Sequence, residues 1–183
     1  MWDTMNATKE QVAQLHQAYL RDLAPAQARL KAKMVNPDDP DLDGTVDSLT
    51  AASRWFLTHI ADPPFPEQAV LPSWWDPAYP AAATPFTTAQ LALIDEMQAY
   101  VGGVMTTARP DAKWVIHRGH KQDFRNGQTM LQLDKGRPFP VRDITYSFAL
   151  SVVKNQVVRV EELPELITAA LANWPRRMPH PAT

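Results

Sequence analysis

The sequence contains no cysteine among its 183 residues. This absence excludes disulfides, iron–sulfur clusters, thiolate zinc sites and cysteine nucleophiles together. No apolar run approaches the length of a transmembrane helix. The polar residues after Met1 lack the basic and apolar regions of a signal peptide. We therefore expect a cytoplasmic protein with no membrane association.

Glycine is scarce, and its six residues are too scattered to form the glycine-rich loops that hold nucleotide phosphates. No Gly-x-Ser-x-Gly nucleophile elbow is present. We expect no cofactor, and we expect a protein that is not an enzyme. A site whose residues are dispersed in sequence and meet only in the folded chain stays open.

Excess charge is also lacking, since 18 basic and 20 acidic residues give a formal net charge of -2. This balance gives no electrostatic reason to approach a phosphate backbone or an anionic membrane. The basic pair Arg176 and Arg177 is too short to indicate nucleic-acid binding. We therefore expect no nucleic-acid partner.

Proline is abundant, with 17 residues, and 45% of the chain is hydrophobic. Proline fixes φ and removes a hydrogen-bond donor, so its clusters indicate extended connectors. We expect one domain over residues 1–174, with a proline-rich connector at 61–86 and a flexible tail at 175–183.

Apolar periodicity predicts four helices. The first begins at a capping box formed by Thr8 and Gln11 and runs to Met34, with a break or kink at Pro25. Further helices are predicted over residues 46–60, from 87 onward and over 160–173. Gly102 and Gly103 lie inside the third helix, which predicts either a close approach of another backbone or a helix end near Tyr100.

Two strands are predicted over residues 113–118 and 128–133, with a turn at Asn126 and Gly127. Residues 144–152 are ambiguous. Their strict apolar alternation favours a strand, whereas Ile144, Phe148 and Val152 also share a helix face. The fold class is α+β, with a helical N-terminal half packed on a small antiparallel sheet and closed by a C-terminal helix.

The acidic segment around Asp39, Asp41 and Asp43 resembles the opening of a calcium-binding loop, and Gly44 follows it. The position of the closing bidentate glutamate is occupied by Thr50. The favoured interpretation is an acidic loop that caps the second helix, and no metal is expected.

Polar residues of the predicted hairpin loop are the candidates for a dispersed catalytic or ligand-binding site. They are His117, His120, Asp123 and Arg125. His120 falls in the loop after the strand that carries His117, so no regular element fixes their geometry.

Aromatic residues of the proline-rich connector are the candidates for a partner-binding surface. They are Trp74, Trp75 and Tyr79, and prolines flank the two tryptophans. Adjacent aromatics on a stiff loop suit a protein partner. The alternative is that they seal the core of the protein.

Residues 94–155 resemble uncharacterised bacterial families, among them domains of unknown function that look immunity-like in polymorphic toxin systems. The resemblance is carried by residues 100–103 (Tyr-Val-Gly-Gly), Trp114, residues 130–133 (Met-Leu-Gln-Leu) and residues 138–141 (Pro-Phe-Pro-Val). It implies a helix, a small sheet and a second helix over 143–155, and it carries no catalytic residues.

Together these patterns favour a non-enzymatic cytoplasmic protein that binds another protein, with an immunity-like inhibitor as the role that the resemblance implies. The competing hypothesis is a small enzyme or ligand-binding protein with a dispersed polar site near residues 117–125. The sequence sets neither the partner nor the oligomeric state.

Overall fold

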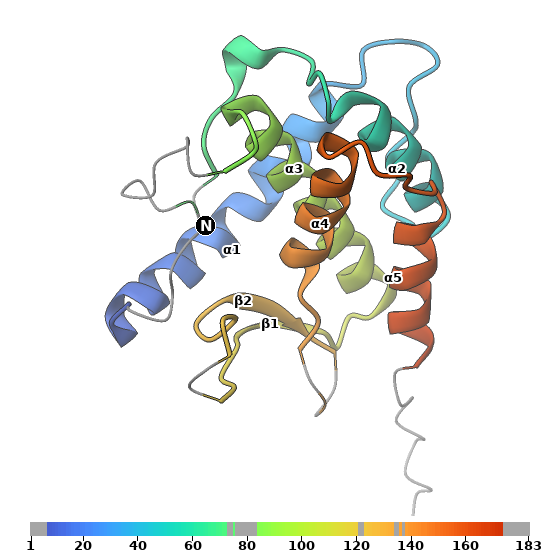
Figure 1. Ribbon diagram of the computed structural model, residues 1–183. Coiled ribbons are helices and arrows are strands. Elements are labelled where there is room, and N and C mark those ends of the chain that lie inside the picture. The colour runs from blue at the N-terminus through green and yellow to red at the C-terminus, as the bar shows by residue number, and fades with distance from the viewer. Residues whose placement is uncertain are drawn as a thin grey trace, which may run out of the picture.

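The long helix α3 (Thr88–Ala108) lies at the centre of the fold in a computed structural model that describes residues 7–72, 75, 84–120, 123–133, 136 and 138–173 (Figure 1). Every residue of α3 from Gln90 to Gly102 is buried. The helix begins at the predicted position, with a capping box formed by Thr87 and Gln90. Because neighbours cover it on all sides, its apolar residues do not form a single stripe.

Helix α1 (Lys9–Ala32) packs along α3 and starts at the predicted Thr8 capping box. The prediction of a break at Pro25 is wrong, because α1 continues through it. Pro25 is exposed, and so is Arg21, whose carbonyl loses its helical partner and can be hydrated instead. Burial of Ala26 and Leu30 holds the second half of α1 on the core.

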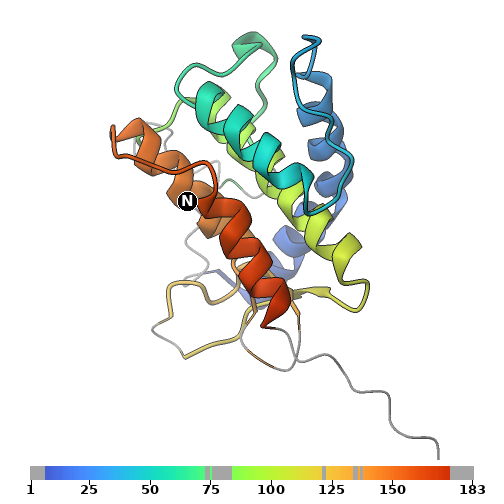
Figure 2. The same cartoon turned by 90° about the vertical axis from the view of Figure 1, so that its right-hand side faces the viewer.

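Helices α2 (Ser48–His59) and α5 (Glu162–Ala172) pack against each other and against α3 (Figure 2). A short 3-10 helix, η1 (Pro66–Gln68), lies between α2 and α3 in the chain. None of the helices in the described ranges is long and apolar enough to cross a lipid bilayer.

Residues 141–153 form helix α4 (Val141–Val153), so the strand favoured by the alternating pattern is wrong. Val141, Thr145 and Ala149 are buried at helical spacing, and the Thr145 hydroxyl donates to the carbonyl of Val141. The large alternating side chains, from Ile144 to Val152, are only partly buried around this narrow contact face. Small residues of α4 therefore make its closest contact with the core. A sequence pattern based on large apolar side chains does not reveal such residues.

Strands β1 (Lys113–Ile116) and β2 (Thr129–Gln132) form the predicted antiparallel hairpin, which lies below the helices in Figure 1. Trp114 pairs with Leu131, which is fully buried and also bridges to Phe139. The α+β architecture expected from the sequence is confirmed.

The two glycines of α3 accommodate side chains, not a neighbouring backbone, and the helix does not end at Tyr100. A Cβ atom on Gly102 would lie 2.6 Å from the indole ring of Trp114, and one on Gly103 would meet the amide of Gln27. The Gln27 amide also donates to the carbonyl of Ala99 at 2.8 Å.

We expect Gly102→Ala to destabilise the protein and Gly103→Ala to be nearly neutral. Alanine gains about 1 kcal/mol in helix propensity at either position. At Gly102 a rigid indole must move, at a cost of about 1–3 kcal/mol. At Gly103 the end of a flexible amide can move away, although its hydrogen bond is lost. Urea denaturation of both variants measures the difference, and equal stabilities would contradict this packing.

Candidate functional site

The hairpin loop, residues 117–128, joins β1 to β2, and backbone hydrogen bonds connect those of its residues that the structure describes. The amide of His117 donates to the carbonyl of Gln128 at 2.8 Å, and the amide of Gly127 donates back to the carbonyl of His117 at 3.0 Å. Gly127 has φ +83°, which glycine adopts without steric cost. Within the loop, the backbone N–H of Asn126 donates to the carbonyl of Asp123 at 2.9 Å.

Asp123 is the centre of the hydrogen bonding in this loop. One carboxylate oxygen lies 3.0 Å from Nε2 of His117, and the other accepts from the backbone N–H of Arg125 at 3.0 Å and its Nε at 3.2 Å. These bonds, the one with His117 above all, lower the pKa of Asp123 to about 2. Three of the four predicted site residues are therefore brought together.

His120 takes part in the loop through its backbone. Its carbonyl accepts from the amide of Asp123 at 2.8 Å and from the side-chain amide of Asn126 at 2.5 Å. The side-chain oxygen of Asn126 in turn accepts from the amide of Gly119 at 2.6 Å. The side chain of Asn126 thus connects the two sides of the loop. The Asn-Gly turn pattern in the sequence does not predict this role.

Gly119 covers the pair formed by His117 and Asp123. A Cβ atom there would lie 2.8 Å from Nε2 of His117 and 2.9 Å from a carboxylate oxygen of Asp123. His117 is only 6% exposed. The pair is therefore packed against the loop backbone, an arrangement that holds the loop in one conformation.

Phe124 points outward from this anchored loop and is 60% exposed. The guanidinium carbon of Arg125 lies 5.0 Å from the centroid of the Phe124 ring, within the range of a cation–π interaction. The loop thus presents an aromatic ring next to a cation. Sequence reasoning missed Phe124, because a single aromatic in a polar loop gives no periodic signal.

The first turn of α4 adds two charged residues that sequence reasoning also missed. Arg142 is buried, and its guanidinium lies 3.7 Å from the Asp143 carboxylate. Burial raises the pKa of Asp143, although Arg142 and Arg125 act against it, and Asp123 raises it further. These electrostatic effects place Asp143 beside the charges of the hairpin loop. Its Oδ2 atom is buried and has no hydrogen-bond partner among the described residues.

We expect the hairpin loop to open as the pH falls from about 4 toward 2. The pKa of Asp123 is depressed from 3.8, so its stabilisation is complete above the unfolded value and is lost as the folded carboxylate protonates. Amide NMR shifts of Arg125 and Gly119, compared with those of α3, would follow this change. A shift profile that Asp123→Asn leaves unaltered would contradict the assignment.

A second group of charges lies between α1 and α3. Lys33 binds Glu96 at 2.7 Å, and Arg29 reaches Asp22, Asp95 and Glu96. Burial nonetheless dominates and raises the pKa of Glu96, whose Oε2 atom has no hydrogen-bond partner in the described part of the chain.

We expect Glu96→Gln to keep the stability at pH 7 within about 1 kcal/mol of wild type or to raise it. A raised folded pKa means that Glu96 stabilises the protein most below its unfolded value and less as the pH rises. The glutamine side chain carries no charge, so the variant does not lose stability in this way as the pH rises. Lys33 and Arg29 can still reach solvent. Thermal denaturation between pH 4 and pH 8 measures the effect; a large loss at pH 7 would contradict it.

The acidic segment uses its carboxylates for local hydrogen bonds. Asp39 accepts from the backbone of Asn36 at 2.8 Å and from the indole of Trp55 at 3.0 Å. Asp43 accepts from the amide and hydroxyl of Thr45 at 2.8 and 2.7 Å. Across the described ranges, no group of three or more His, Asp or Glu residues is arranged to hold a metal ion.

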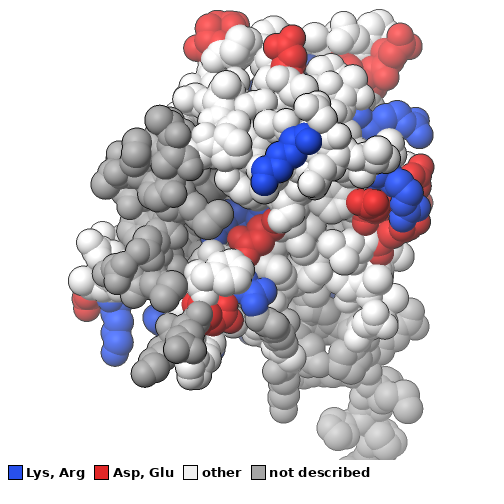
Figure 3. All heavy atoms as spheres, viewed as in Figure 1, with Lys and Arg blue, Asp and Glu red and all other residues white. Residues whose placement is uncertain are grey.

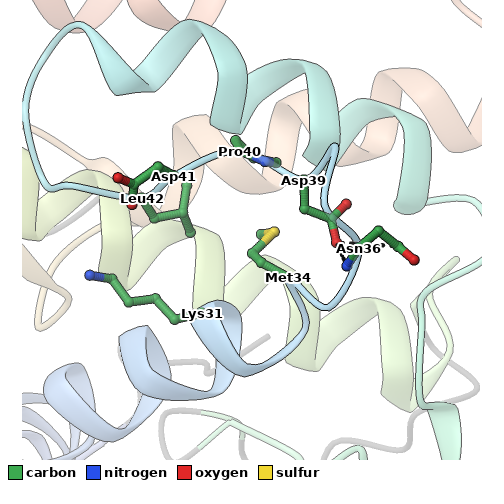
Figure 4. A pocket seen from close by; sticks show the side chains of 7 residues that line it. All are labelled: Lys31, Met34, Asn36, Asp39, Pro40, Asp41 and Leu42. Atoms are coloured by element: carbon green, nitrogen blue, oxygen red, sulfur yellow. Dashed lines mark hydrogen bonds between the residues drawn. The ribbon is translucent and has the colours of Figure 1, made fainter.

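A hollow of about 250 Å³ lies between the end of α1 and the acidic segment (Figure 4). Lys31 lies on the α1 side, while Asp41 and Asp39 come from the segment that follows. A second hollow of about 250 Å³ shares Lys31 and Leu42 and extends to Tyr100. Both hollows are open to solvent and largely polar.

Trp75, one of the three residues predicted to bind a partner, is buried and cannot belong to an exposed surface. Trp75 is 5% exposed and belongs to the hydrophobic core, and its amide donates to the carbonyl of Pro72 at 2.9 Å. Trp74 and Tyr79 lie outside the described residues. The exposed large hydrophobic residues of the described connector are Val70 and Leu71.

No family model, curated protein or solved structure is similar enough to this chain to assign it to a family.

Proposed function

We propose that this protein is a non-enzymatic cytoplasmic protein that binds another protein, with the hairpin loop as its binding element. The observation that carries the proposal is the exposed ring of Phe124 on a loop whose conformation Asp123 fixes. An ordered loop loses little conformational entropy on binding, and exposed aromatic and arginine side chains are the usual energetic centres of protein interfaces.

The polar residues of the loop support this function more than catalysis. His117 and Asp123 bind each other, and Gly119 packs against both. Their contacts therefore stabilise the conformation of the loop. An immunity-like inhibitor, the role that the sequence resemblance implies, would use such a loop to bind its target.

A photo-crosslinking residue in place of Phe124, in the native host, tests the proposal. We expect one discrete protein adduct at this position and none with the same residue at Val157, which is 96% exposed and lies between α4 and α5. Phe124→Ala should then weaken the recovered complex at least about tenfold, as for an interface hot spot. Equal adducts at both positions, no adduct, or full binding by Phe124→Ala would refute it.

A second candidate function, a small-ligand site at the same cluster, is favoured by one observation. The pKa of Asp123 is lowered and that of its neighbour Asp143 is raised, a divergence that also occurs where two carboxyl groups take different chemical roles. Screening of small polar compounds by NMR tests it. Shifts at Arg142 and Asp143 that Asp143→Asn abolishes would support the site, and an absence of such shifts would exclude it.

A further inference from the structure

We infer that the partner of the hairpin loop presents an acidic protein surface; this inference rests on the proposed function. Charge is unevenly distributed along the chain. Residues 109–140, between α3 and α4, contain seven basic and three acidic residues, a net charge of +4. All other residues contain 11 basic and 17 acidic residues, a net charge of −6. The hairpin is thus a basic unit on an otherwise acidic protein.

The described acidic groups of this basic unit are neutralised within it. Asp123 binds Arg125 at 3.2 Å and His117 at 3.0 Å. Asp111 binds Arg109 at 3.0 Å. Their charges are therefore balanced before any partner approaches, and they oppose an acidic surface only weakly.

Basic groups of the same unit remain open to solvent. Lys113 at the start of β1 and Arg118 in the hairpin loop are both exposed, and neither makes an ion pair with any other described residue. Arg125, which lies next to Phe124, is half-buried and is already bound to Asp123. An acidic partner that approaches the hairpin therefore meets the exposed positive charges of Lys113 and Arg118.

Several acidic side chains lie at the end of the molecule opposite the hairpin. In Figure 3 these lie along the top, over η1 and the segment that follows α1, whereas the hairpin lies at the bottom; further acidic side chains lie at mid-height and at the lower left of the same view. The net charge of +4 on residues 109–140 favours the approach of an acidic partner to the hairpin over its approach to the rest of the chain.

The observations favour an acidic protein over a nucleic acid. The basic unit has the length of one hairpin, and the net charge of −6 on the remaining chain would repel a polyanion that extends beyond it. The exposed ring of Phe124 also suits an apolar pocket with an acidic rim.

Titration of the full ¹⁵N-labelled chain with a short peptide of alternating Glu and Leu tests the inference. We expect amide shifts concentrated at Lys113, Arg118 and Phe124, with binding that weakens as ionic strength rises from about 0.02 to 0.3 M. Arg118→Glu should weaken binding about fivefold or more, and Arg54→Glu, at an exposed position on α2, should leave it unchanged.

Four results would overturn the inference: no binding of the peptide at low salt, equal binding of a peptide of alternating Lys and Leu, equal effects of the two charge reversals, or tighter binding of a short DNA duplex at the same residues. None of these depends on crosslinking at position 124. A loop that captures a protein but ignores the acidic peptide would retain the proposed function and exclude only the acidic partner.

Discussion

Replacement of Asp123 by alanine is expected to weaken partner binding about 10- to 100-fold, although its carboxylate faces the interior of the loop. The carboxylate binds His117 on one side and both the backbone and the side chain of Arg125 on the other. Without the carboxylate the loop samples many conformations. Binding must then order several of its residues, at an entropic cost of at most about 1–2 kcal/mol for each residue.

The controls separate a loop effect from a loss of folding. Asp123→Asn keeps an oxygen that can accept from the amide of Arg125, so we expect an intermediate affinity. Glu165→Ala removes a salt-bridged acid outside the hairpin and should leave affinity unchanged. Far-UV circular dichroism of all three variants should match wild type. Full affinity of Asp123→Ala for the crosslinked partner would show that the loop needs no carboxylate anchor.

Replacement of Trp114 by alanine is expected to cost about 3 kcal/mol of stability, the largest loss that we predict. Its indole ring packs against the space left by Gly102 and meets the ring of Tyr19 edge-on, with centroids 5.3 Å apart. These contacts attach the hairpin to α1 and α3. Their removal leaves a cavity beside a glycine that cannot fill it.

Chemical denaturation and amide hydrogen exchange would measure this effect. We expect the free energy of unfolding to fall and the amides of β1 and β2 to exchange before those of α3. Trp114→Phe should lose less, because a smaller ring still covers Tyr19. A change of under about 1 kcal/mol for Trp114→Ala would contradict the attachment of the hairpin through this ring.

Capping and turn residues predicted the local structure well, because their physics is local. Thr8 and Thr87 begin helices as expected, and Gly127 turns the hairpin with a positive φ. The failures came from tertiary context. Pro25 is tolerated because its face of α1 is exposed, and α4 is helical because Thr145 and Ala149 fit closely against the core.

The candidate site was only partly predictable. His117, Asp123 and Arg125 could be proposed together because they lie within nine residues of one another in a loop. Asp143 could not be joined to them, since only the packing of α4 brings its carboxylate near Arg125 and Asp123. The burial of Trp75 was equally hidden, because the segment around it has no periodic apolar pattern and the core cluster that it joins is built from other parts of the chain.

Backbone ¹⁵N relaxation at neutral pH tests most directly whether the free hairpin loop is already rigid. We predict order parameters of about 0.85 for the amides of Gly119, Arg125 and Asn126, equal to those of α3. Values below about 0.6 in the wild-type protein would mean that Asp123 does not fix the loop, and the proposed binding element would lose its physical basis.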